Sequence, residues 1–155
     1  MIRRTLQTLL PVVALAGVLL AEPVEARQTT GLDPALTEMA GEVASAWAAG
    51  DTERLGPWLR ADGIRLQLEG PARENLAPRH VLAAFREVLR DHEDGATEVT
   101  RVAPVAGSSN RGLVEFVWTA RVKGTSHAVE HSYFAGVVRT EDGWRIDEFR
   151  RVPRR

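Results

Sequence analysis

The sequence predicts an α+β fold in which N-terminal helices pack on a curved antiparallel sheet, giving a cone-like shape with room for a pocket. Two segments, residues 34–49 and 78–90, carry apolar residues at the three- and four-residue spacing of amphipathic helices. From residue 98 onward the apolar residues recur at every second position, which is the period of a strand. We expect one domain over residues 33–153, preceded by a linker at residues 27–32.

The first predicted helix begins at Asp33 and Pro34, an N-cap residue followed by proline at the first helical position. Gly50 ends it, because glycine readily adopts the left-handed conformation that closes a helix. One face of this helix is apolar and should lie on the core: Leu36, Met39, Ala40, Val43 and Trp47.

A short turn and a strand follow the first helix. Asp51 is a second cap residue, and residues 52–55 can form one helical turn before Gly56. Residues 64–69 then alternate apolar and polar side chains, so one face of this strand is buried and the other is wet. Gly70 and Pro71 end the strand.

The second long helix begins at Pro78, and its polar end lies at residues 91–95. Its apolar face consists of Val81, Leu82, Phe85, Val88 and Leu89. The alternating pattern predicts four further strands, at residues 99–105, 113–122, 127–139 and 144–152. Turn residues separate them, among them Gly124 and the pair Asp142-Gly143.

The first 26 residues have the three parts of an export signal. Arg3 and Arg4 form the basic start, residues 9–20 the apolar run, and Ala26 the cleavage site. The apolar run is shorter than the roughly 20 residues that span a bilayer. We therefore expect a cleaved signal peptide, a periplasmic or secreted protein, and no stable membrane insertion.

Composition excludes several classes of function. The chain has no cysteine, which removes disulfides, lipid attachment to cysteine and thiolate metal sites. Its formal net charge of −1 gives no general attraction to nucleic acid. Glycine-rich phosphate loops and the Gly-x-Ser-x-Gly elbow are also missing from the sequence. We expect no cofactor, no metal and no nucleic-acid partner.

Three phrases resemble the nuclear transport factor 2-like superfamily, in particular its small exported bacterial members of undefined function. They are residues 46–51 with Leu55, residues 81–85, and residues 142–146, reading AWAAGD, VLAAF and DGWRI. The resemblance covers essentially the whole mature chain. It implies a cone of helices on a bent sheet, often with a pocket, and a homodimer formed through the open face of the sheet.

Residues 127–131 read H-x-x-E-H, the zinc-binding pattern of one class of metallopeptidases. That chemistry needs a helix, on which the two imidazoles lie about 6 Å apart. The alternation around this segment indicates a strand instead, where His127 and His131 lie about 13 Å apart, too far to share a metal. The strand interpretation therefore assigns no metal site to these histidines.

The same strand would place His131 and Tyr133 on one face of the sheet. In superfamily enzymes such a pocket holds a general base beside a hydrogen-bond donor, so the resemblance implies His131 as base and Tyr133 as donor, with Asp147 as the orienting carboxylate. The alternative is that these are ordinary core or edge residues. In a domain this small the four tryptophans are expected to form the core, and if one of them lines a pocket, we expect it to be Trp118.

Two classes of function remain open. The favoured one is a non-catalytic exported domain that binds a small apolar ligand or an envelope protein, with Trp118, His131 and Tyr133 as ligand-binding residues. The alternative is a cofactor-free pocket enzyme of the isomerase or dehydratase kind, acting on an apolar small molecule through His131, Tyr133 and Asp147.

Overall fold

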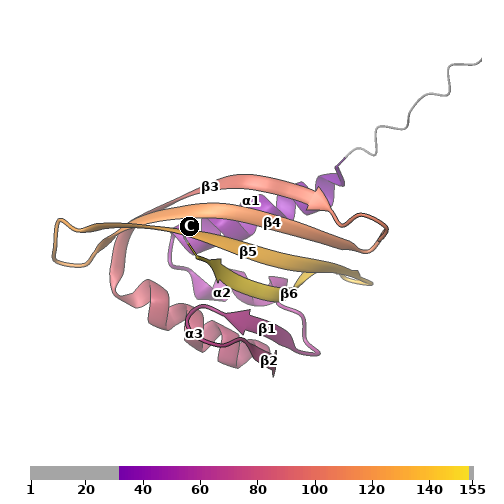
Figure 1. Cartoon of the computed structure of the whole chain (residues 1–155), viewed down its shortest axis with the longest axis horizontal. Helices are drawn as coiled ribbons and strands as arrows, with labels where there is room; N and C mark the ends of the chain where they lie inside the picture. Colours follow the sequence, from indigo (N-terminus) through magenta and orange to yellow (C-terminus); the bar gives the residue numbers. More distant parts are fainter. Residues whose placement is uncertain (1–31, 154–155) are drawn as a thin grey trace, which may run out of the picture.

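Helices cover one face of a curved, unclosed six-stranded sheet (Figure 1). The computed structural model describes residues 32–153; the expected export signal, its cleavage site and Arg154 and Arg155 lie outside them. In chain order the elements are α1 (Pro34–Ala48), α2 (Thr52–Leu55), η1 (Gly56–Trp58), β1 (Ile64–Gln67), β2 (Arg73–Leu76), α3 (Pro78–Arg90), β3 (His92–Pro104), β4 (Arg111–Val122), β5 (Ala128–Thr140) and β6 (Gly143–Val152).

The strands follow the order β2-β1-β6-β5-β4-β3. Neighbouring strands are antiparallel except β1 and β6, which pair in parallel. The sheet therefore ends in the short strand β2 on one side and the long strand β3 on the other (Figure 1). The predicted α+β class and the helix-on-curved-sheet arrangement are confirmed.

Hydrogen bonds join the start of α1 to the end of β5 and the start of β6. Asp33 caps the helix by accepting a hydrogen bond from the Ala35 amide at 2.9 Å. The same carboxylate accepts hydrogen bonds from the Trp144 indole at 3.0 Å and from Arg139 at 2.8 Å. These hydrogen bonds, first from Trp144 and then from Ala35, together with the charge of Arg139, hold the pKa of Asp33 below its ordinary value.

Two features of the sheet differ from the sequence-based prediction. β2 was not predicted, because its four residues are exposed or half-buried and show no alternation. β3 begins at His92, seven residues before the predicted start at Val99. The polar segment there extends the ladder with β4, in which His92 lies opposite Val122, so strand pairing overrides a weak local pattern.

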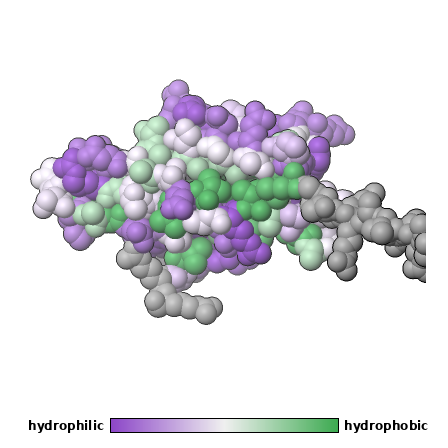
Figure 2. Space-filling view, turned by 90° about the horizontal axis from the view of Figure 1, so that it is seen from above, coloured by the Kyte–Doolittle hydropathy of each residue, from purple (hydrophilic) through white to green (hydrophobic). Residues whose placement is uncertain are grey.

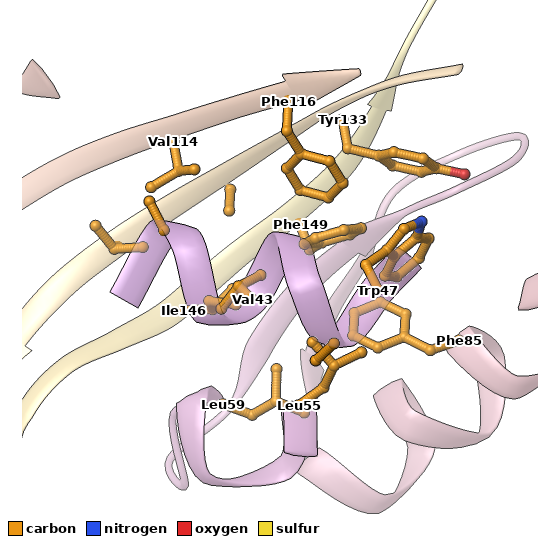
Figure 3. Close-up of a cluster of buried hydrophobic side chains, with 14 of the residues drawn as sticks. Val43, Trp47, Leu55, Leu59, Phe85, Val114, Phe116, Tyr133, Ile146 and Phe149 are labelled. Atoms are coloured by element: carbon orange, nitrogen blue, oxygen red, sulfur yellow. The ribbon is translucent and has the colours of Figure 1, made fainter. Parts of the chain in front are cut away.

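The core lies between the helices and the sheet, and Trp47 is at its centre (Figure 3). Its side chain extends from α1 into the core and has no exposed surface. Its ring centroid lies 4.7–6.2 Å from those of five aromatic side chains on α3, β4, β5 and β6: Phe85, Phe116, Trp118, Tyr133 and Phe149. Aromatic pairs at these distances stabilise a core beyond the area they bury.

The C-terminal end of α1 approaches β3 closely at Gly95. A Cβ atom at this position would lie 2.3 Å from the carbonyl oxygen of Ala48 and 3.0 Å from the Trp118 indole nitrogen. Two residues on, the Thr97 hydroxyl donates a hydrogen bond to the Ala44 carbonyl at 3.0 Å. Only glycine permits this contact between helix and strand, so Gly95 positions α1 against the sheet.

Replacement of Gly95 by alanine tests this contact. We expect Gly95→Ala to lower the free energy of unfolding by about 1–3 kcal/mol, because the methyl group forces the helix and the strand apart. Gly41→Ala is the matched control, since a Cβ at Gly41 meets nothing within 4 Å. This exposed helical change should stabilise by about 0.5–1 kcal/mol. Urea unfolding measures both; equal effects would contradict the close approach.

The Asp33 contacts predict a pH-dependent stability. Because the pKa of Asp33 is lowered in the folded state, its contribution is complete above the unfolded value of about 3.9 and is lost as the pH falls through the folded value. We expect Asp33→Asn to lower the urea midpoint at pH 7, and the difference from the wild type to shrink progressively as the pH falls below about 3.9. Asp62→Asn, at a side chain with 81% exposure, is the control. A difference that does not change with pH would refute the ionic contribution.

Candidate functional site

The space between helices and sheet, where the sequence suggested a pocket, is filled by aromatic side chains. Tyr133 and Trp118 are each 1% exposed and belong to the Trp47 cluster. Figure 3 shows the Tyr133 ring lying beside Trp47 and Phe116. Burial, opposed in part by the charge of Arg151, raises the pKa of the Tyr133 hydroxyl well above its ordinary value. Tyr133 thus stays protonated at any physiological pH.

The structure does not bring His131, Tyr133 and Asp147 into one site. His131 lies opposite Trp118 in the sheet, with the two rings stacked at 6.2 Å, and its ring centroid is 6.5 Å from that of Tyr133. Asp147 lies on the other face of the sheet, where its carboxylate pairs with Arg111 at 2.7 Å. Asp147 therefore does not lie where it could orient His131, the role predicted for it from the sequence.

A bulge in β6 explains the position of Asp147. Val137 pairs with Ile146 and Gly136 pairs with Glu148, so Asp147 is an extra residue between two ladder positions. Its Oδ1 atom lies where a Cβ on Gly136 would approach it within 3.4 Å, on the face opposite the core. Simple alternation along the sequence cannot reveal such a bulge.

The H-x-x-E-H segment is extended, as the alternation indicated. Val129, Glu130 and His131 lie in β5, paired with residues of β4, and His127 precedes the strand. Within residues 32–153, no three histidine, aspartate or glutamate side chains gather closely enough to hold a metal ion. In the same residues no helix has the length and apolar character needed to cross a membrane.

A groove with a volume of about 730 Å³ lies between α3 and the β1–β2 hairpin. Its walls are mostly apolar: Leu66, Leu68, Pro71, Leu76, Ala83, Ala84 and Val88. Four polar side chains stand among them: Glu69, Arg73, His80 and Glu87. We call this hollow the α3–hairpin groove. Its volume lies within the range of small-molecule sites.

α3 presents two different faces to its surroundings. Val81, Phe85 and Leu89 are buried in the core. A second stripe, at spacings of three and four residues from His80 to Val88, lines the groove. Ala83 and Ala84 lie in the middle of that stripe, and their short side chains leave the groove open.

The charges around the groove are unequal. Both acidic side chains are engaged: Glu69 pairs with Arg151 at 3.3 Å and Glu87 with Arg90 at 3.1 Å. Arg73 forms no ion pair among the described residues, while its neighbour Glu74 pairs with Arg65. The groove therefore has one uncompensated cation, and an anion is the group that this cation attracts.

The groove could not be predicted from the sequence, for two reasons. One wall is β2, which was not predicted, and Arg73 and Leu76 lie on that strand. The other reason is that His80 has no partner at a spacing that can be recognised in the sequence. The one available signal was the pair Ala83-Ala84 on a helix that is otherwise rich in large side chains.

A second, much smaller cavity of about 100 Å³ lies beside Trp118, between the end of α1 and the start of β3. The indole nitrogen of Trp118 is buried there and has no hydrogen-bond partner. His92 closes one side, its Nδ1 atom 2.7 Å from the Val88 carbonyl. The expected pocket wall Trp118 thus borders a cavity with room for only a few water molecules.

Comparisons with known proteins identify the fold. No protein-family model and no curated protein matches the chain. Solved structures do match. An NTF-2-like protein of unknown function from Shewanella oneidensis MR-1 has 15% identity and a TM-score of 0.56, over 76% of this chain and 95% of that one.

Two further similar structures carry functional descriptions. A Novosphingobium aromaticivorans protein, provisionally assigned as an aromatic ring hydroxylase, has 18% identity and a TM-score of 0.63, over 77% of this chain and 88% of that one. A protein with a ketosteroid isomerase-like fold from Catenulispora acidiphila DSM 44928, in complex with trimethylamine, has 14% identity and a TM-score of 0.58, over 75% and 85%. These identities show the fold alone: the chain has the nuclear transport factor 2-like fold.

Proposed function

We propose that the protein binds a small molecule with an apolar body and an anionic end in the α3–hairpin groove. The observation that carries this proposal is the apolar lining of a hollow of about 730 Å³ that contains one unpaired cation, Arg73. An apolar ligand gains about 25 cal/mol for each Å² it removes from water, so burial of about 200 Å² is worth about 5 kcal/mol. This is enough to drive binding when the walls are already formed.

The polar side chains favour an anion over a cation. Glu69 pairs with Arg151, and Glu87 pairs with Arg90, which also contacts Asp91. Arg73 has no such partner and is left to attract a carboxylate or a similar group. His80 stands in the same groove and receives a hydrogen bond from Arg79 at 3.3 Å on its Nε2 atom. Its other ring nitrogen is available as a donor to the ligand.

Binding suits the geometry better than catalysis does. The enzyme alternative requires His131, Tyr133 and Asp147 to converge on one substrate, yet Tyr133 lies in the core and Asp147 on the opposite face of the sheet. With the export signal expected at residues 1–26, the ligand would be met outside the cytoplasm. We therefore propose an exported carrier or sensor domain for a small apolar anion.

Filling the groove should abolish binding. We expect Ala83→Phe to weaken the binding of 8-anilinonaphthalene-1-sulfonate, an apolar anionic dye, by roughly tenfold or more, because the new ring occupies the space of the ligand. Ala35→Phe places the same ring on an exposed position of α1 and should leave affinity unchanged. Fluorescence titration measures both. Equal affinities in the two variants, with melting temperatures like the wild type, would contradict the groove as the site.

Removing the positive charge of Arg73 tests whether the groove recognises the anionic end of its ligand. We expect Arg73→Gln to weaken the binding of the dye by roughly three- to tenfold, which is the typical contribution of one charge-assisted contact at a partly exposed site. Arg65→Gln removes a neighbouring arginine that does not line the groove and should have little effect. The difference should shrink at high salt. If Arg73→Gln and Arg65→Gln behave alike, the proposed recognition of an anion fails, although an apolar site could remain.

A further inference from the structure

Strand β3 is a long open edge of the sheet. It has 13 residues and pairs with β4 on one side only, whereas the other edge strand, β2, has four residues. An edge strand presents a row of unpaired backbone N–H and C=O groups, which natural proteins cover or protect. Among the described residues no strand or helix pairs with the outer side of β3.

Apolar side chains are exposed along this edge. Three large hydrophobic side chains of the described chain are exposed: Leu32 at 39%, and Val99 and Val105 at 37% each. Val99 lies in the middle of β3 and Val105 directly follows it. Figure 2, which views the molecule from the β3 side, shows hydrophobic residues gathered in a band along the middle of that side.

Two opposite charges flank Val99. In the ladder with β4, Glu98 lies opposite Val117, Val99 opposite Phe116, and Arg101 opposite Glu115, with Thr100 as an extra bulged residue. Glu98 and Arg101 therefore lie one ladder step to either side of Val99 and face the same side of the sheet. Neither forms an ion pair among the described residues.

The opposite charges of Glu98 and Arg101 make the outer edge of β3 complementary to the same edge of a second copy. In an antiparallel pair of identical strands related by a two-fold axis, residues at equal distances before and after the axis lie opposite each other. Because Thr100 is a bulged residue, an axis between Val99 and Thr100 places Glu98 of each copy opposite Arg101 of the other. Val99 of each copy then lies beside the axis, opposite Thr100 of the other copy, where the exposed surface of the valine is covered.

The helix beneath β3 leaves room for such a partner. α1 is held under this strand by the contacts at Gly95 and Thr97. On the flank of α1 beside Ala44, the exposed positions Thr37 and Gly41 carry small side chains. A second copy can therefore approach the edge without a clash against long side chains of the helix.

We propose that β3 pairs antiparallel with β3 of a second copy of this chain, about a two-fold axis between Val99 and Thr100, so that the two sheets become continuous. The occupant is a copy of the same chain because Glu98 and Arg101 are complementary to each other when the strand meets itself. This interface lies at the edge of the sheet and differs from a dimer formed through the open face, which the fold resemblance implied.

Charge reversal provides the test. The mature chain, purified from an exporting host, should be a dimer by sedimentation at about 100 μM. Glu98→Arg places like charges opposite each other twice, and we expect a rise in the dimer dissociation constant of roughly tenfold or more. The double variant Glu98→Arg/Arg101→Glu restores opposite pairs and should recover the wild-type constant. Glu141→Arg, an exposed charge reversal in the β5–β6 turn, is the control.

The outcomes separate cleanly. Weakening in Glu98→Arg with recovery in the double variant supports the edge pairing, as does protection of the backbone amides of residues 96–103 from hydrogen exchange in the dimer. A monomer at 100 μM overturns the proposal. A dimer whose dissociation constant ignores both charge reversals also overturns it and directs attention to the open face of the sheet. Binding of the dye in the groove is independent of either result.

Discussion

Trp47 is the residue through which the two layers of this fold meet. It extends from the last turn of α1, is fully buried, and contacts aromatic rings from α3, β4, β5 and β6 at centroid distances of 4.7–6.2 Å. These contacts form only when α1 lies close to the sheet, and Gly95 in β3 permits that close approach because it has no side chain. Asp33 fixes the other end of the same helix to Trp144 and Arg139.

This aromatic cluster decides where a ligand can bind. It occupies the space between helices and sheet, including the positions of Tyr133 and Trp118, and leaves only a cavity of about 100 Å³ there. The larger hollow of about 730 Å³ lies on the second face of α3, against the β1–β2 hairpin. One helix thus serves two purposes: Val81, Phe85 and Leu89 stabilise the core, and Ala83 and Ala84 keep the groove open.

Strong periodicity and cap residues made most of the fold predictable from sequence. Asp33, Pro34 and Gly50 correctly bounded the first helix, Pro78 began the next, and the alternation after residue 98 identified the sheet. The polar start of β3 and the short strand β2 could not be found this way, because cross-strand pairing and not local pattern makes them extended. The candidate site was less predictable: the β6 bulge that turns Asp147 away and the groove wall formed by β2 both depend on tertiary structure.

The central claim is that small apolar molecules enter the α3–hairpin groove and not the aromatic interior. A methyl NMR titration of the mature chain with 8-anilinonaphthalene-1-sulfonate tests it most directly, since leucine, valine and alanine methyl groups line the groove. We expect saturable shifts at Leu66, Leu68, Leu76, Ala83, Ala84 and Val88, with the core methyls of Val114 and Val137 unchanged. Shifts confined to the core methyls or to the exposed Val99 and Val105, with the groove silent, would contradict it.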